Sequence, residues 1–306
     1  MKLRQVKGSA ISGLFYCLLI FVLGQKLEGG NAAESECGRQ HADLGSRVSV
    51  PGDDHEAQFG EFPWMVAVLR KEKHDGIDLS VYTCGGSLIH PQVVLTAAHC
   101  MADVGKEYKA RVGEWDVQTK AEIYPHQDRN VTTIIVHPEY KRNPLLYDLA
   151  LLILDSPVTI MGNVDVVCLP DKNQLVDNNL SCVSGGWGTK GKFYNLLQKV
   201  ELPIVDTESC QTRLHTSLGT QYQLHESFLC AGGDPGKDRC RTDFGSPLVC
   251  QFPEKKDKYF QAGILSWALA CSESSVPAMY SSLVKAVDWI DKIMIDNNFS
   301  TSVYKN

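Results

Sequence analysis

Residues 240–250 read Cys-Arg-Thr-Asp-Phe-Gly-Ser-Pro-Leu-Val-Cys, and this stretch decides how the rest of the sequence is interpreted. Two further motifs precede it: Leu-Thr-Ala-Ala-His-Cys at residues 95–100 and Asp-Leu-Ala-Leu-Leu at residues 148–152. A histidine, an aspartate and then a nucleophile, in this chain order, form one known arrangement in which imidazole acts as general base and a carboxylate fixes its tautomer. Here the third position is Phe244, whose benzyl side chain offers no hydroxyl or thiol for His99 to deprotonate.

The three motifs resemble the nucleophile loop, the histidine motif and the aspartate motif of trypsin-like serine proteases. Residues 240–250 align without a gap to the family pattern C-x-G-D-S-G-G-P-L-V-C, and Asp148 falls on the family's aspartate. Smaller landmarks at residues 60–64, 186–188 and 266–267 extend the resemblance over residues 51–296. It implies an all-β fold of two six-stranded antiparallel β-barrels with a C-terminal α-helix and a cleft between the barrels.

Local patterns agree with that fold. Short β-rich runs separated by Gly, Pro, Asn and Asp are typical of a barrel, and the boundary between barrels is predicted near residues 155–180. Apolar residues recur at roughly helical spacing from Val284 to Ile295, which predicts the C-terminal helix.

The chain divides into four predicted parts. Residues 1–24, with a basic start and a short apolar run, are predicted to be a signal peptide, so the protein is expected to be secreted and to lack a membrane span. Residues 25–50 are expected to be a short pro-segment tethered by Cys37, without a clip module, which needs six cysteines. Residues 51–296 form the trypsin-like domain, and residues 297–306 a C-terminal tail.

Charge and cysteine content narrow the class further. The chain carries 30 Lys and Arg against 36 Asp and Glu, which disfavours nucleic acid as a partner. Of 11 cysteines, Cys17 lies in the signal peptide, leaving an even number for an oxidising compartment. The family resemblance implies these pairs: Cys37–Cys168, Cys84–Cys100, Cys182–Cys250, Cys210–Cys230 and Cys240–Cys271.

Two further requirements of catalysis are predicted to be missing. The resemblance places Pro51-Gly52-Asp53-Asp54 where active relatives carry the Ile-Val-Gly-Gly terminus, and only Arg47, upstream, offers a basic cleavage site. Asp243 is therefore expected to lack its usual ammonium partner. Thr242 replaces a glycine whose N–H would help to form the oxyanion hole. Ser246 is the only substitute nucleophile that the motif offers.

Other candidate sites are less specific. Asp238 occupies the position that selects Arg or Lys in trypsin, and Ala268 and Ala278 replace glycines that line that pocket. Glu114, Asp116 and Glu122 resemble the family's calcium loop, although a solvated acidic loop explains them equally well. Asn130, Asn179 and Asn298 head N-x-S/T sequons and are predicted surface glycosylation sites.

Residues 57–65 and 124–129 resemble stretches of the serine protease homologues of arthropod body fluid, which act as non-enzymatic cofactors in extracellular proteolytic cascades, including prophenoloxidase activation. The leading hypothesis is an inactive binding protein or cofactor whose partner is a protease or zymogen, with innate immunity or melanization as a plausible process. One alternative is a weak Arg/Lys-directed endopeptidase using Ser246. Another is a decoy that binds substrates or inhibitors through the cleft and Asp238.

Overall fold

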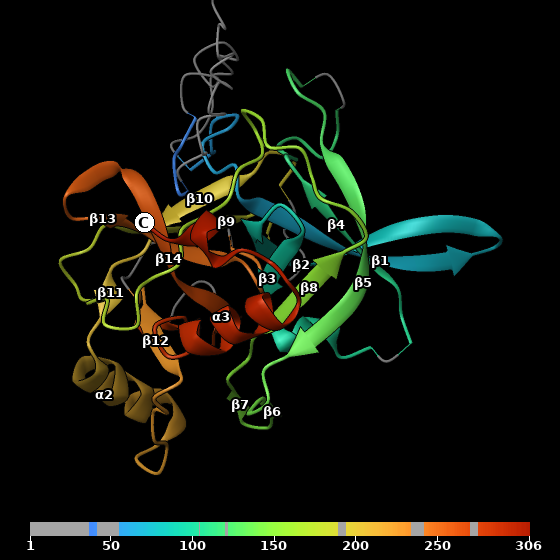
Figure 1. Cartoon of the computed structure of the whole chain (residues 1–306). Coiled ribbons are helices and arrows are strands. Elements are labelled where there is room, and N and C mark those ends of the chain that lie inside the picture. Colours follow the sequence, from blue (N-terminus) through green and yellow to red (C-terminus); the bar gives the residue numbers. More distant parts are fainter. Residues whose placement is uncertain are drawn as a thin grey trace, which may run out of the picture. The chain divides into compact units, whose positions relative to one another are not determined.

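The computed structural model describes residues 37–41, 55–103, 105–119, 122–188, 194–233, 242–269 and 275–306. Within the compact unit Ser35–Asn306, strands dominate and helices are few (Figure 1). The all-β prediction is therefore confirmed. None of the helices in the described part of the chain combines the length and apolar character needed to cross a bilayer.

The first half of the domain is a closed six-stranded barrel with strand order β1-β2-β3-β8-β5-β4. Strands β3 and β8 are buried along their whole length, and all of their residues except Thr96 are apolar. The strands are β1 (Met65–His74), β2 (Ile77–His90), β3 (Val93–Thr96), β4 (Tyr108–Val112), β5 (Gln127–Val136) and β8 (Ala150–Leu154).

The second half is a seven-stranded sheet with order β10-β9-β13-β14-β15-β12-β11. The strands are β9 (Cys182–Gly186), β10 (Gln198–Glu201), β11 (Ile204–Val205), β12 (Phe228–Ala231), β13 (Pro247–Phe252), β14 (Lys255–Trp267) and β15 (Ala278–Ser282). This differs from the predicted closed barrel of six strands.

The difference has a local cause at Leu202-Pro203, the two residues that separate β10 from β11. Leu202 N donates to Cys182 O beside one edge of the sheet, whereas Pro203 O accepts from Gly232 N beside the other edge. Proline has no N–H to continue a ladder, so the chain bends there and one strand becomes two. Counted as one bent strand, β10 and β11 would restore the expected six.

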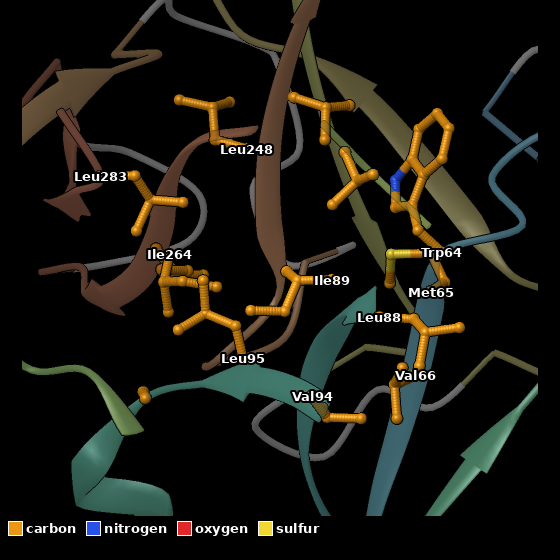
Figure 2. Close-up of a cluster of buried hydrophobic side chains, with 14 of the residues drawn as sticks. Trp64, Met65, Val66, Leu88, Ile89, Val94, Leu95, Leu248, Ile264 and Leu283 are labelled. Carbon is orange, nitrogen blue, oxygen red and sulfur yellow. The ribbon is translucent and has the colours of Figure 1, made fainter. Parts of the chain in front are cut away.

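The boundary between the two halves lies where the sequence predicts it. β8 ends at Leu154 and β9 begins at Cys182, and the segment between them contains no named strand. One hydrophobic core serves both halves: Figure 2 shows Leu88 and Leu95 of the barrel in the same cluster as Leu248 and Ile264 of the second sheet.

Short elements complete the fold. The C-terminal helix α3 runs from Val287 to Asp296 and buries Val287, Ile290 and Met294, whereas Ile295, which the periodicity had placed on the apolar face, is 65% exposed. The others are η1 (Ala98–Met101), the hairpin β6 (Lys141–Arg142) and β7 (Leu145–Leu146), α2 (Thr207–Leu218) and η3 (Thr301–Tyr304).

Residues 297–306, predicted as a tail, are part of the packed domain. The side chain of Tyr304 in η3 is fully buried, and its hydroxyl donates to Asp291 Oδ1 at 2.7 Å. Leu169 N donates to Tyr304 O, and Lys258 Nζ donates to Asn306 Oδ1 at 2.6 Å. Residues 297–306 thus follow the domain as a packed C-terminal segment, with Tyr304 buried and Phe299 and Val303 packed against the core.

The described residues contain four disulfides, which are four of the five pairs that the resemblance implies: Cys37–Cys168, Cys84–Cys100, Cys182–Cys250 and Cys210–Cys230. Cys240 and Cys271 lie outside the described residues. The first pair fastens residues 37–41 to the domain, and backbone bonds from Gly38 N to Val166 O and from Tyr259 N to Gly38 O reinforce it. Residues 1–36 and 42–54, with Arg47 and Pro51, also lie outside the described residues.

Candidate functional site

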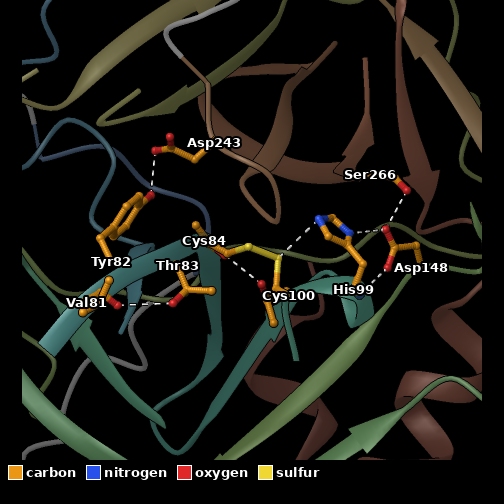
Figure 3. The surroundings of a disulfide bond; sticks show 11 residues. Val81, Tyr82, Thr83, Cys84, His99, Cys100, Asp148, Asp243 and Ser266 are labelled. Atoms are coloured by element: carbon orange, nitrogen blue, oxygen red, sulfur yellow. Dashed lines mark hydrogen bonds and ion pairs between the residues drawn. A yellow bond between two sulfur atoms is a disulfide. The ribbon is translucent and has the colours of Figure 1, made fainter. Parts of the chain in front are cut away.

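His99 and Asp148 form the half of the site that is preserved. His99 lies in η1, directly after β3, and the Cys84–Cys100 disulfide fastens that turn to β2. Asp148 is fully buried, and its Oδ2 lies 2.7 Å from His99 Nδ1. Its carboxylate also accepts from His99 N at 2.8 Å and from Ser266 Oγ at 2.6 Å (Figure 3). This is the geometry of a base held in one tautomer and orientation by a carboxylate.

Phe244 lies where the partner of that base would be. Its ring packs edge to face on the His99 imidazole, with centroids 5.5 Å apart and an interplanar angle of 79°. Such pairs contribute about 0.5–1.5 kcal/mol beyond area burial. The backbone of the loop is fixed as well: Gly85 N donates to Phe244 O at 2.8 Å, and Gly245 N to Leu265 O at 2.9 Å. The arrangement holds a base against a ring that cannot be deprotonated.

Ser246 does not supply a replacement hydroxyl. The residue is fully buried, and its Oγ has no hydrogen-bond partner. It is pressed against β2, since a Cβ on Gly85 would lie 2.0 Å from Ser246 Oγ. A nucleophile must reach both its base and its substrate. The endopeptidase alternative therefore has no support from this geometry.

The groups of the described residues that donate to Asp243 are neutral. Asp243 is fully buried, and its Oδ2 accepts from Tyr82 Oη at 2.6 Å (Figure 3). The same oxygen accepts from Trp187 N at 2.6 Å. Its Oδ1 has no hydrogen-bond partner, and no cationic partner is recorded among the described residues. Burial raises the pKa of Asp243 to about 6, against the lowering effect of the Tyr82 and backbone hydrogen bonds. Gly186 permits the close approach, because a Cβ there would lie 2.1 Å from Asp243 Oδ2.

Tyr82 is a site residue that the sequence reasoning missed. It lies in β2, 161 positions before Asp243, and its ring packs edge to face on Trp187 at 6.0 Å. No motif marks a tyrosine two residues before Cys84, and the only signal in the sequence was its closeness to a cysteine that is implied to pair with Cys100 of the histidine motif. Thr242, on the other side of Asp243, is buried.

The candidate specificity pocket is described only in part. Ala278 is buried in β15, where it pairs with Ala231 of β12, and Ala268 follows β14 half-buried. Asp238 lies outside the described residues. The structure therefore places the two methyl groups but not the carboxylate that would select a basic side chain.

The calcium-loop residues are only partly brought together. Glu114 and Glu122 approach each other, whereas Asp116 Oδ1 accepts from Gln118 N within its own turn. The third member of the cluster is His126, whose Nδ1 lies 3.1 Å from Glu114 Oε2. Burial raises the pKa of Glu114 to about 7.

This donor set does not suit calcium. Ca²⁺ prefers six to eight oxygen ligands, whereas here an imidazole nitrogen faces Glu114 and the Arg111 guanidinium approaches the same oxygen at 3.1 Å. Spacing along the loop predicted Asp116 as a member of this cluster and gave no sign of His126. In the structure the end of the loop returns to its start, which places His126 beside Glu114.

The three sequon asparagines are all exposed. Asn130 lies on β5 and donates from Nδ2 to Asp155 Oδ2 at 2.7 Å, Asn179 lies in a turn with Asp177, and Asn298 follows α3 with a φ of +60°. Glycosylation at these positions stays a prediction.

Comparison with known proteins identifies the relatives of this chain. The family model described as Trypsin matches residues 52–290. Phenoloxidase-activating factor 2 from Galleria mellonella is 45% identical over 280 residues, covering 88% of this chain and 92% of that protein. Inactive CLIP domain-containing serine proteases A28 and A8 from Anopheles gambiae are 37% and 40% identical, and the aligned regions cover 80% and 79% of this chain and 65% and 67% of those proteins.

Proposed function

Because the chain belongs to the trypsin family, we propose that it is a secreted, catalytically inactive member that acts by binding other proteins of an extracellular proteolytic cascade. One observation carries the proposal: the residue that packs on the His99 imidazole is Phe244, which has no nucleophilic atom. The features of a signal peptide in residues 1–24 support secretion.

The names of the relatives suggest which cascade. One relative is called a phenoloxidase-activating factor, and two others are called inactive serine proteases. We therefore place the protein in a cascade that leads to phenoloxidase activation and melanization, where a protease or its zymogen is the partner. Fold alone does not decide function, so the partner must be recognised by surface loops of this chain.

The preserved half of the site is consistent with a structural role. Asp148 accepts three hydrogen bonds while fully buried, and loss of one donor would leave a buried carboxylate less satisfied, at about 1–3 kcal/mol. In this proposal His99 and Ser266 stabilise the buried Asp148 carboxylate, and His99 has no nucleophile to deprotonate.

The test is a reconstituted activation reaction with the secreted protein, an activating protease and prophenoloxidase. We expect phenoloxidase activity to rise when the protein is added, while the protein alone hydrolyses no Arg-ester substrate and incorporates no fluorophosphonate. The variant His99→Gln serves as the matched control, because it removes any general base but leaves the surface loops unchanged. Equal stimulation by both proteins, with similar unfolding midpoints, supports a non-catalytic role; loss of stimulation in a folded His99→Gln would contradict it.

The decoy alternative makes a different prediction. Phe244 packs on the His99 imidazole, and Ala268 and Ala278 carry methyl groups where the family resemblance places glycines of the pocket. Benzamidine, which mimics an Arg side chain, is therefore expected to bind no better than millimolar. Micromolar binding abolished by Asp238→Ala would favour the decoy function instead.

A further inference from the structure

The hairpin of β1 and β2 extends past the barrel as a two-stranded ribbon (Figure 1). β4 pairs with β1 only as far as Arg70, and β3 pairs with β2 only from Ser87 onward. Between these limits the two strands pair with each other. Among the described residues, β1 is the only strand that pairs with Ile77–Val81, so the outer edge of β2 is free along this segment.

The free segment of β2 carries an apolar stripe. Side chains of a strand alternate between its two faces, so Ile77, Leu79 and Val81 lie on one face. Ile77 is 64% exposed and Leu79 is 43% exposed, and Val81 is half-buried. Covering these three side chains would remove apolar surface from water on a part of the molecule that has no core of its own.

The two edges of the ribbon are protected to different degrees. Edge strands usually avoid further pairing by carrying lysine or proline or by being covered. β1 carries Lys71 and Lys73, and Lys71 N donates to Glu107 O at 2.8 Å. The segment Ile77–Val81 contains no lysine or proline, and its one charged residue, Asp78, has Oδ1 3.9 Å from Lys73 Nζ of β1. The edge of β2 is therefore open to a further strand.

The sequence of this segment is complementary to itself. In two antiparallel copies related by a two-fold axis at Leu79, Leu79 lies opposite Leu79 of the second copy. Ile77 then lies opposite Val81, and Asp78 lies opposite Ser80. All the apolar side chains of both copies meet on one face, and no two like charges face each other across the seam.

Other registers are less favourable. A shift by one residue would place the apolar side chains of the two copies on opposite faces of the joined sheet. An axis at Asp78 would oppose two carboxylates. An axis at Ser80 would set Asp78 against Tyr82, whose hydroxyl already donates to Asp243. The pattern of residues thus selects Leu79 as the centre.

We propose that Ile77–Val81 at the edge of β2 pairs with the same segment of a second copy of this chain, which joins the two hairpins into one sheet. The self-complementary pattern favours a second copy over a foreign strand, which would require no such symmetry. A single strand pair buries less than the roughly 1,000 Å² of a stable interface, so the dimer is reversible, with a Kd of about 10–100 µM. This interaction is independent of the residue at position 244 and of any protease partner.

The experiment is sedimentation velocity of the untagged secreted protein from about 1 to about 300 µM, a range that brackets the expected Kd. We expect a concentration-dependent shift from monomer to dimer. Leu79→Lys should raise Kd at least about tenfold, because it places two ammonium groups opposite each other at the axis. Leu175→Lys is the matched control: Leu175 is 70% exposed in the segment between β8 and β9, and its replacement should leave Kd unchanged. Both variants should keep the wild-type unfolding midpoint.

Cross-linking tests the register. Directly opposed residues have Cβ atoms about 4.5–5.5 Å apart, so Leu79→Cys should form a reducible covalent dimer under mild oxidation. Ile77→Cys, which would face Val81, should cross-link at least about tenfold more slowly, as should Leu175→Cys. Equal rates for the three variants would overturn the pairing.

Two results would overturn the proposal as a whole. One is a wild-type protein that stays monomeric over the full range, or a dimer that Leu79→Lys leaves intact. The other is a monomeric protein whose folded Leu79→Lys variant no longer stimulates the phenoloxidase reaction, which would assign this edge to a strand of another protein.

Discussion

Replacing Asp243 by asparagine should change how stability depends on pH. The carboxyl is fully buried with two neutral donors, Tyr82 Oη and Trp187 N, and burial raises its pKa to about 6 from an ordinary value near 3.9. The folded state therefore binds more protons than the unfolded state between about pH 4 and pH 6. The stability from the protonated form is present below pH 4 and is lost as pH rises through 6.

The magnitude follows from the shift. Two pKa units correspond to about 3 kcal/mol, so wild type should lose about that much relative to Asp243→Asn between pH 4 and pH 7.5. For a domain of this size the loss corresponds to roughly 6–10 °C in the unfolding midpoint. The asparagine carbonyl can accept from both Tyr82 and Trp187, so the variant keeps the two bonds and removes only the ionisation.

The assay is thermal unfolding of both proteins at half-unit steps from pH 4 to pH 8, with disulfides intact. Asp78→Asn is the control, because that carboxylate is 89% exposed and its removal should leave the pH profile unchanged. Parallel profiles for wild type and Asp243→Asn would refute the claim of an uncompensated buried carboxyl. A wild type that gains stability over the variant as pH rises would show an ammonium partner for Asp243, and so a processed terminus in the site.

Three other outcomes are expected. Phe244→Ser should gain neither Arg-ester hydrolysis nor fluorophosphonate labelling, because Thr242 replaces the glycine that the family resemblance assigns to the oxyanion hole; activity near that of an active trypsin would contradict this. Removing the disulfide by Cys37→Ala with Cys168→Ala should lower the unfolding free energy by about 2–5 kcal/mol in denaturant titrations, whereas a change under 1 kcal/mol would mean that the N-terminal segment contributes little. Tyr304→Phe removes the hydrogen bond to Asp291 and should lower the midpoint by about 2–4 °C, and an unchanged midpoint would count against the anchoring role of this residue.

The fold and the catalytic half of the site were accessible from the sequence because short motifs carry them. His99 and Asp148 belong to motifs whose positions alone place a base beside a carboxylate, and the structure has them 2.7 Å apart. Tyr82 was not accessible, because its contact with Asp243 depends on how the first barrel packs on the second sheet across 161 residues of chain.

Local elements were missed for a different reason. Helix α2 buries only Cys210 and Leu214, so its apolar pattern is too sparse to stand out, although Asp206 caps it by accepting from Ser209 N. The segment after α3 has no periodicity, and scattered contacts of Phe299, Val303 and the buried Tyr304 fasten it to the domain. Such features depend on tertiary contacts that a pattern of residue types does not contain.

Substitutions at position 99 and at position 244 have different energetic consequences, which explains why the histidine is present and the serine is not. Replacing the His99 side chain would remove one of three hydrogen bonds to the buried Asp148 carboxylate, whereas a phenyl ring at position 244 adds an aromatic contact with the imidazole. Beside Asp243, Tyr82 donates a neutral hydrogen bond to Oδ2 and offsets part of the desolvation cost of the buried carboxyl. If the protein is inactive as we propose, Tyr82 and Phe244 therefore stabilise that form, and a variant with catalytic activity would need a cationic partner for Asp243 in addition to a hydroxyl at position 244.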